Sequence, residues 1–180
     1  MSGVLLVAAT RQEAAHLPDL PLLITGIGKT AAASAVAARL ATERFDLVLN
    51  VGTAGALVDQ VAGLYVPRTV VNHDISADAL AAMGHPVTAS LPVDGQDDVV
   101  LASGDAFVAD TVARDLLARR AQLVDMEGFA VAWACRQAGV PCRLVKHVSD
   151  RADEEAVAWP TLVERSAREL GAWVAQRYAS

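Results

Sequence analysis

Two acidic residues in the second half of the chain lie where acids can take part in proton transfer. The stretch 124–150 has the pattern of a strand end, a helix, a turn and a second strand. Glu127 stands in the first turn of the predicted helix, and Asp150 follows the last strand. Helix N-termini and the carboxyl ends of strands meet at one edge of an α/β sheet, so we expect the two carboxyl groups to share a crevice.

Both acids also have an ordinary structural explanation. A glutamate in a first helical turn interacts favourably with the helix dipole, and an aspartate after a strand is often the cap of the next helix. A third acid, Glu13, forms a Thr-x-x-Glu capping box with Thr10, which predicts a helix over 10–17. Spacing by itself therefore leaves a structural and a functional role open for each of the three acids.

Glycine-containing turns follow three of the predicted strands. The first, Gly26-Ile27-Gly28-Lys29-Thr30, is similar to the end of a phosphate loop, but that motif requires a glycine at position 23, where the chain has Leu23. This excludes a nucleoside-triphosphatase, and we interpret Lys29 as structural. The other two turns are residues 52–55 and 103–107.

Short β-branched apolar runs alternate with helical patterns through most of the chain. The alternation predicts one α/β domain over residues 1–180, in three layers, with a central mixed, largely parallel sheet between helices. Pro67 indicates an edge or a bulge. We expect a helix followed by a loop over 74–95. The predicted strands are 4–8, 22–25, 46–51, 64–72, 98–102 and 142–148, and the other predicted helices are 31–43, 108–120, 125–138 and 160–178.

Composition and charge exclude several classes of function. Hydrophobic residues make up 53% of the chain and charged residues 20%, with a net charge of −6 and no basic cluster, so we expect no nucleic-acid partner. No apolar run approaches the roughly 18 residues of a membrane span, and no signal peptide is recognisable, so we expect a cytoplasmic protein. Cys135 and Cys142 are expected to be reduced core thiols, and the scattered histidines, His73 among them, lack metal-ligand spacing.

Five blocks of the sequence resemble one family of enzymes, the nucleoside phosphorylases and hydrolases, and particularly the 5′-methylthioadenosine/S-adenosylhomocysteine nucleosidases. The block V-D-M-E-G is similar to the V-E-M-E-A of this family, although Lys146 stands where the family commonly has arginine. The other blocks occur in the order of the family and extend over most of the chain: T-G-I-G-K-T-A-A-A, N-V-G-T-A-G, S-G-D-A-F and V-S-D-R-A-D-E-E.

The resemblance implies a role for each of the three acids. Glu127 would accept hydrogen bonds from the ribose hydroxyls, Asp150 would protonate the purine at N7, and Glu13 would activate the attacking water. These roles suit the chemistry, because cleavage of an N-glycosidic bond develops positive charge on the ribosyl ring and needs a proton at the leaving base.

The resemblance also implies a set of substrate-binding residues. Phe107 would stack on the base, and Val108 would offer backbone hydrogen bonds to its edge. Met126 would pack against the sugar, and Thr53 would lie close to Asp150. By analogy with the family we expect a homodimer in which the second subunit closes the pocket.

Several alternatives remain open at this point. A nucleoside phosphorylase is disfavoured because Ala8-Ala9-Thr10-Arg11-Gln12-Glu13 has no glycine and carries an acid that would repel phosphate. A futalosine hydrolase differs only in its substrate, which the sequence leaves undetermined. A nucleoside-binding module without catalysis is the alternative from another class, and retention of three acids argues against it. Since no ligand cluster or phosphate loop is visible, we expect activity to need neither a metal, a cofactor nor phosphate.

Overall fold

A mixed sheet runs through the centre of the molecule. The computed structural model describes residues 3–179 of the chain, apart from the side chains of residues 157, 158, 160 and 161. Within this range nine strands follow the order β2-β1-β3-β8-β7-β5-β6, with β9 beside β3 and β4. The pairs β1/β2, β1/β3, β3/β9, β5/β7 and β7/β8 are parallel. The strands are β1 (Gly3–Ala8), β2 (Leu22–Ile24), β3 (Phe45–Ala56), β4 (Leu64–Tyr65), β5 (Pro67–Asn72), β6 (Ser90–Pro92), β7 (Asp97–Ser103), β8 (Leu123–Asp125) and β9 (Cys142–Asp150).

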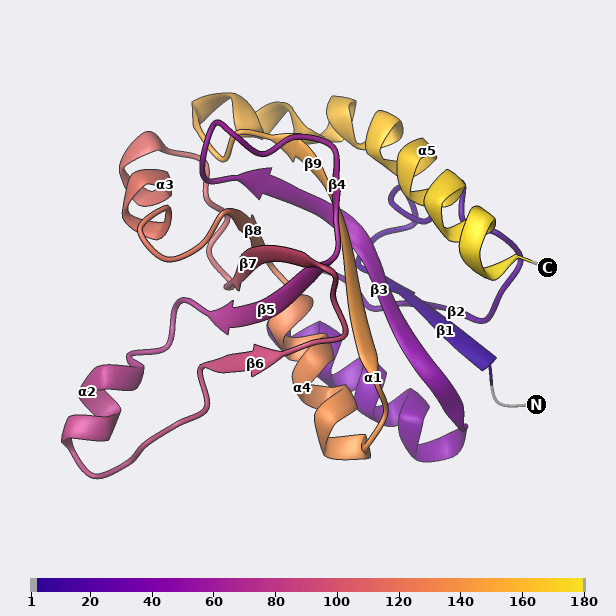
Figure 1. Ribbon diagram of the computed structural model, residues 1–180, viewed down its shortest axis with the longest axis horizontal. Helices are drawn as coiled ribbons and strands as arrows, with labels where there is room; N and C mark the ends of the chain where they lie inside the picture. Colours follow the sequence, from indigo (N-terminus) through magenta and orange to yellow (C-terminus); the bar gives the residue numbers. More distant parts are fainter. Residues whose placement is uncertain (1–2, 180) are drawn as a thin grey trace.

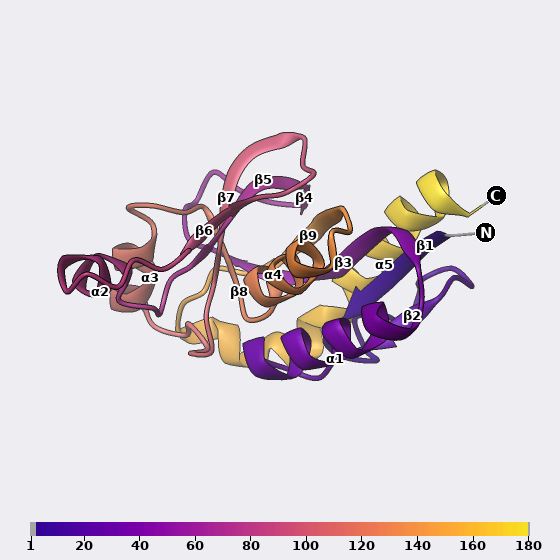
Figure 2. The ribbon, with the colours of Figure 1, turned by 90° about the horizontal axis from the view of Figure 1, so that it is seen from below.

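Helices cover both faces of this sheet, which gives the three layers predicted from the sequence (Figure 1). The helices are α1 (Lys29–Thr42), α2 (Ala77–Ala82), α3 (Thr111–Leu117), α4 (Gly128–Ala138) and α5 (Trp159–Tyr178), with a 3-10 helix over Glu154–Ala158. Helices α1 and α4 pack together on one face, and α5 packs on β3 and β9 from the other (Figure 2). The predicted fold class is therefore confirmed.

The core divides into two main clusters because successive side chains of a strand point to opposite faces. In β3, Val48 belongs to the cluster under α1 and α4, whereas Leu49 belongs to the cluster under α5. In β9, Leu144 and Val145 divide in the same way. Burial on both faces explains why these strands read as continuous apolar runs.

The prediction of a helix over 10–17 is wrong, because residues 11–16 form turns instead. The capping box itself does form: the Thr10 amide and hydroxyl donate to Glu13 Oε2 at 3.2 and 3.0 Å, and the Glu13 amide donates to Thr10 Oγ1 at 3.2 Å. Pro18 follows within two turns, lacks an N–H and disfavours helical backbone in the residue before it. Too few residues remain to offset the cost of nucleating a helix.

Other boundaries differ more modestly from the prediction. The predicted strand 64–72 is divided into β4 and β5, and its pairing with β7 shifts register between Pro67 and Thr69, as a bulge at the proline predicts. The segment 74–95 contains α2 followed by a loop over 83–89, as predicted, but residues 90–92 then form β6, which was not predicted. Figure 1 shows α2 on an excursion that extends away from the sheet. Across the described part of the chain, none of the helices combines the length and the apolar character that a membrane span needs.

Candidate active site

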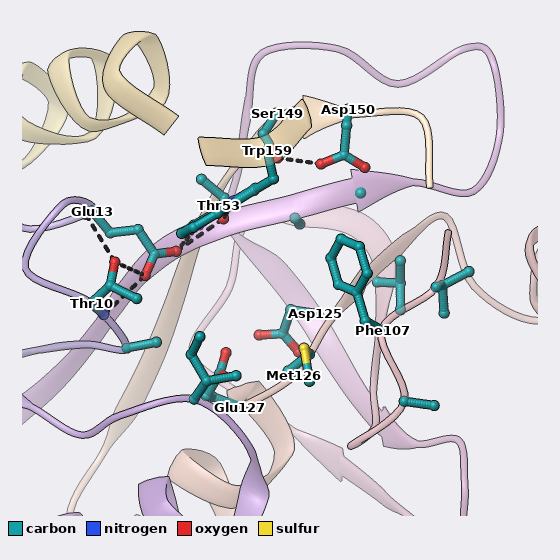
Figure 3. Close-up of a pocket in the computed structure, with 17 residues that line it drawn as sticks. Thr10, Glu13, Thr53, Phe107, Asp125, Met126, Glu127, Ser149, Asp150 and Trp159 are labelled. Atoms are coloured by element: carbon teal, nitrogen blue, oxygen red, sulfur yellow. Dashed lines mark hydrogen bonds between the residues drawn. The ribbon is translucent and has the colours of Figure 1, made fainter. Parts of the chain in front are cut away.

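A cavity opens at the carboxyl ends of β1, β3, β8 and β9, as expected for an open α/β sheet (Figure 3). Its walls come from the turns after β1 and β2, the end of β3, the loop after β7, the β8–α4 junction, the end of β9 and the first residue of α5. All seven predicted site residues line it: Glu13, Thr53, Phe107, Val108, Met126, Glu127 and Asp150. The structure therefore brings together side chains that lie up to 137 positions apart, from residue 13 to residue 150.

Glu13 is buried, and both of its carboxyl oxygens accept hydrogen bonds. Oε2 accepts from the amide and hydroxyl of Thr10, while Oε1 accepts from the Thr53 amide at 2.8 Å and the Thr53 hydroxyl at 2.9 Å. Donors on both sides fix the plane of the carboxyl group. Thr53 bonds to Glu13, and among the described contacts it makes no hydrogen bond to Asp150.

Glu127 is buried at the N-terminus of α4, but its side chain does not cap that helix. Instead Oε1 accepts from the Gly28 amide at 2.8 Å. The first glycine turn thus contributes a backbone donor, and Gly28 has φ 96°, a conformation that favours glycine. Burial, followed by repulsion from Asp125, raises the pKa of Glu127 to about 7, although Lys146 and the Gly28 amide oppose the shift.

A buried ion pair lies beneath Glu127. Lys146 Nζ lies 2.8 Å from Asp125 Oδ2, and both side chains are 2% exposed. Asp125 also accepts hydrogen bonds from the Gly128 amide at 2.9 Å and from the Ser103 hydroxyl. Burial by itself lowers the pKa of Lys146, but attraction to Asp125 and Glu127 outweighs it, so the pKa of this lysine lies above its ordinary value.

Lys146 also approaches Glu13 through the space left by a glycine. Gly52 pairs with Lys146 in the β3–β9 ladder. A Cβ atom added at Gly52 would lie 3.0 Å from Glu13 Oε1 and 3.4 Å from Lys146 Nζ. The second glycine turn therefore allows the acid and the lysine to approach the same point of the backbone.

Asp150 ends β9 and is half-buried. Its Oδ1 accepts from the Ala152 amide at 2.9 Å and its Oδ2 from the Ser149 hydroxyl at 2.6 Å. The following 3-10 helix is capped by Asp153 rather than by Asp150. The helix-cap explanation considered from the sequence thus does not describe Asp150. Glu127 does stand at the N-terminus of α4, where the helix dipole favours a carboxylate, although its side chain makes no capping hydrogen bond.

Phe107 lies across the cavity from Glu13, and Met126 lies beside Glu127 (Figure 3). Phe107 is 53% exposed, whereas its neighbour Val108, which also lines the cavity, is buried. Lys29 lies outside the cavity, where Nζ donates to Asn72 at 2.8 Å and pairs with Asp74, in agreement with its structural interpretation.

Lys146, Asp125 and Trp159 are among the residues in or behind the cavity wall that sequence reasoning missed. A lysine inside the apolar strand C-R-L-V-K-H-V was a usable signal, because a buried lysine requires a partner charge. Asp125 stands where a helix N-terminus needs an acceptor, which is a sufficient structural explanation of this residue, and it does accept from the first amide of α4, that of Gly128. Trp159 gave no local signal, although its indole reaches the cavity from the first turn of α5.

Neither cysteine belongs to the site. Cys135 and Cys142 are buried free thiols, which agrees with the prediction of core thiols. Within residues 3–179 no group of three or more histidine, cysteine, aspartate or glutamate side chains is placed to hold a metal ion.

Comparison with known proteins agrees with this geometry. Residues 97–178 match the phosphorylase superfamily. The chain is 29% identical to the aminodeoxyfutalosine nucleosidase of Helicobacter pylori, over 85% of this chain and 77% of that protein. It is 27% identical to the 5′-methylthioadenosine/S-adenosylhomocysteine nucleosidase of Shewanella putrefaciens, over 77% of this chain and 71% of that protein.

Solved structures show the same fold. The 5′-methylthioadenosine/S-adenosylhomocysteine nucleosidase of Helicobacter pylori superposes with a TM-score of 0.85 at 23% identity, over 97% of each chain. The corresponding enzyme of Neisseria meningitidis gives 0.84 at 22% identity, over 98% of each chain. The resemblance predicted from the sequence is confirmed: residues 97–178 match the phosphorylase superfamily, and the similar proteins include nucleosidases of both names.

Proposed function

We propose that the protein is an N-ribosyl hydrolase that cleaves a purine nucleoside of the 5′-methylthioadenosine/S-adenosylhomocysteine type into free base and ribosyl product. The observation that carries the proposal is the placement of Glu13, Glu127 and Asp150 around one cavity. The names of the relatives, all nucleosidases, support the same reaction class.

Each carboxyl group has a distinct task in this reaction. Asp150 gives a proton to N7 of the purine while the bond between C1′ and N9 breaks, so the base leaves neutral. Glu127 faces the sugar, where it accepts hydrogen bonds from the hydroxyls and stabilises the positive ribosyl ring. Glu13 takes the proton of the water whose oxygen bonds to C1′. Asp150 therefore donates a proton to the leaving base, Glu13 accepts one from water, and Glu127 supplies negative charge.

Hydrolysis is favoured over phosphorolysis by the charge around the cavity. Among the 17 described residues that line it, none is a lysine or an arginine, and four are acids. Lys146 lies behind this wall and is already paired with Asp125. A phosphate dianion would meet carboxylates without a free cation, whereas water has a ready base in Glu13.

The 5′ substituent is the least constrained part of the proposal. The relatives include enzymes named for aminodeoxyfutalosine and for methylthioadenosine, and futalosine hydrolysis is therefore the alternative within the same reaction class. A nucleoside-binding module remains the alternative from another class. It is disfavoured because the carboxyl groups are held in fixed positions by named donors at Glu13, Glu127 and Asp150.

The substrate and reaction class can be tested together. The protein is incubated with methylthioadenosine, adenosylhomocysteine, adenosine, inosine and futalosine, each with and without phosphate, and free base and sugar are assayed. We expect base release without phosphate and free ribosyl sugar as product. Base release that requires phosphate and yields a ribose 1-phosphate would contradict hydrolysis, and binding without release would identify a binding module.

Asp150→Asn separates the general-acid role from a structural one. Asparagine retains the oxygen that accepts from Ala152 but has no proton to give, so we expect a normal melting temperature and a loss of roughly 10²- to 10⁴-fold in kcat. Asp153→Asn is the matched control, because Asp153 caps the adjacent 3-10 helix and lies outside the cavity lining. An Asp150→Asn variant that melts normally and keeps more than about a tenth of the wild-type rate contradicts the role.

The raised pKa of Glu127 has a consequence that is measurable without substrate. The carboxyl group ionises near 4.5 in the unfolded chain and near 7 in the fold, so the folded state binds more protons between these pH values. Stability therefore falls as pH rises from about 4.5 to 7, by up to roughly 3 kcal/mol from this group. Glu127→Gln removes this contribution, so the difference in free energy of unfolding between variant and wild type, measured in urea, should change by that amount. A constant difference across this pH range contradicts the shift.

We infer that the active species is a homodimer. Phe107, which lines the cavity, is 53% exposed, so this side of the cavity is open to cover by another surface. Apolar side chains are exposed nearby on α3, where Val112 is 81% and Leu116 62% exposed. On the excursion between β5 and β6, α2 buries no residue and Met83 is 65% exposed. A second copy of the chain would cover these surfaces.

Light scattering coupled to size exclusion tests the oligomeric state. We expect a dimer at micromolar concentration, and a shift toward monomer with reduced activity in Leu116→Lys. Leu22→Lys provides the control, because Leu22 is also an exposed leucine but lies on β2, at the other end of the sheet from α2 and α3 (Figure 1). A fully active monomeric wild type contradicts the inference.

A further inference from the structure

Trp159 is joined to Glu13 by a chain of two hydrogen bonds. Its indole Nε1 lies 2.9 Å from Thr53 Oγ1, and Thr53 Oγ1 lies 2.9 Å from Glu13 Oε1 (Figure 3). Thr53 and Trp159 are 106 positions apart in the chain. All three side chains line the same cavity.

The chemistry of the groups fixes the direction of both bonds. An indole N–H only donates, so Thr53 Oγ1 is the acceptor of the first bond. A hydroxyl has a single proton, and an ionised carboxyl group only accepts, so that proton points to Glu13 Oε1. With its oxygen already engaged by the indole, the Thr53 hydroxyl is oriented toward Glu13 and is not free to rotate elsewhere.

The two oxygens of Glu13 are held unequally. Oε1 receives the Thr53 amide and hydroxyl at 2.8 and 2.9 Å, whereas Oε2 receives the Thr10 amide and hydroxyl at the longer distances of 3.2 and 3.0 Å. A carboxylate offers about four acceptor positions, and all four are occupied. A water molecule must therefore replace one donor. The Thr10 hydroxyl on Oε2 is the hydroxyl donor with the longer contact to Glu13, and its own oxygen is held only by the Glu13 amide at 3.2 Å, so it is the partner that a water molecule displaces most readily.

We propose that Trp159 is a positioning residue for the base of the reaction: through Thr53 it anchors Oε1 of Glu13, so that Oε2 is the oxygen that exchanges a donor for the attacking water. This inference rests on the proposed hydrolase function. Trp159 begins α5 nine positions after Asp150, and Ala156 between them is fully buried. The segment from the end of β9 to the start of α5 thus carries the general acid at one end and the anchor of the base at the other.

Trp159→Phe tests the anchor because it keeps an aromatic ring in the cavity wall and removes only the N–H donor. Loss of one hydrogen bond of ordinary net strength should reduce kcat by about 3- to 10-fold, with KM within about twofold of wild type. Thr53→Val removes the hydroxyl that transmits the effect, and Thr53→Ser retains it. In the Thr53→Val background, Trp159→Phe should reduce kcat no further, while in the Thr53→Ser background it should still do so.

A second readout reports the hydrogen bond without catalysis. The indole N–H resonance of Trp159, assigned by its absence in Trp159→Phe, should shift and exchange faster with solvent in Thr53→Val, and should remain near its wild-type position in Thr53→Ser. This measurement uses the unliganded protein. Melting temperatures identify any variant that fails to fold. If Trp159→Phe fails to fold, the kcat of Thr53→Val compared with that of Thr53→Ser tests the same hydrogen-bonded chain.

The outcomes separate this proposal from the proposed function. An active wild type whose kcat is unchanged in Trp159→Phe, or in which only KM rises, overturns the positioning role and leaves the hydrolase. An indole resonance that does not respond to Thr53→Val overturns the hydrogen bond itself. A wild type that hydrolyses no nucleoside, with a responsive resonance, overturns the hydrolase and the positioning role with it, while the bond remains. The expected set of kcat losses together with a responsive resonance supports the proposal.

Discussion

The buried ion pair between Lys146 and Asp125 is the interaction on which the rest of the site depends. Three carboxyl groups, those of Glu13, Asp125 and Glu127, lie close together in a buried region, and Lys146 is the cation among them. Breaking a buried pair of this kind typically costs about 3–5 kcal/mol, because one charge is left without compensation. Asp125 also binds the first amide of α4, so the pair holds the helix that carries Glu127.

Backbone conformation contributes as much to the site as the acidic side chains do. The Gly28 amide reaches Glu127, and the missing side chain at Gly52 leaves room for both Glu13 and Lys146. The glycine turns therefore do for carboxyl groups what a phosphate loop does for phosphates: they bring N–H groups close to an anion. This explains how a sequence that is similar to a phosphate loop at residues 26–30 serves a site without a nucleoside triphosphate.

Helix α5 packs against the turn that carries Glu13 and holds it in place, although that turn has no regular secondary structure. A Cβ atom at Gly171 would lie 2.2 Å from the His16 carbonyl oxygen, so the helix and the turn are in direct contact. His16 Nε2 lies 2.9 Å from Glu164 on the same helix, and Trp159 reaches Glu13 through Thr53. The last helix thus supports a residue near the start of the chain, and the cavity is complete only when both ends of the chain have folded.

The sequence by itself determined the α/β alternation, the three layers, and the meeting of Glu127 and Asp150 at one edge of the sheet. These follow from local periodicity and from the rule that strand ends and helix N-termini share an edge. Only the tertiary structure decided that Lys146 pairs with Asp125 and that Thr53 bonds to Glu13 rather than to Asp150. It also decided that Trp159 donates to Thr53. Such contacts depend on the register of β3 against β9 and on the path of α5 across the sheet, and pairings between side chains as much as 106 positions apart leave no local pattern in the sequence.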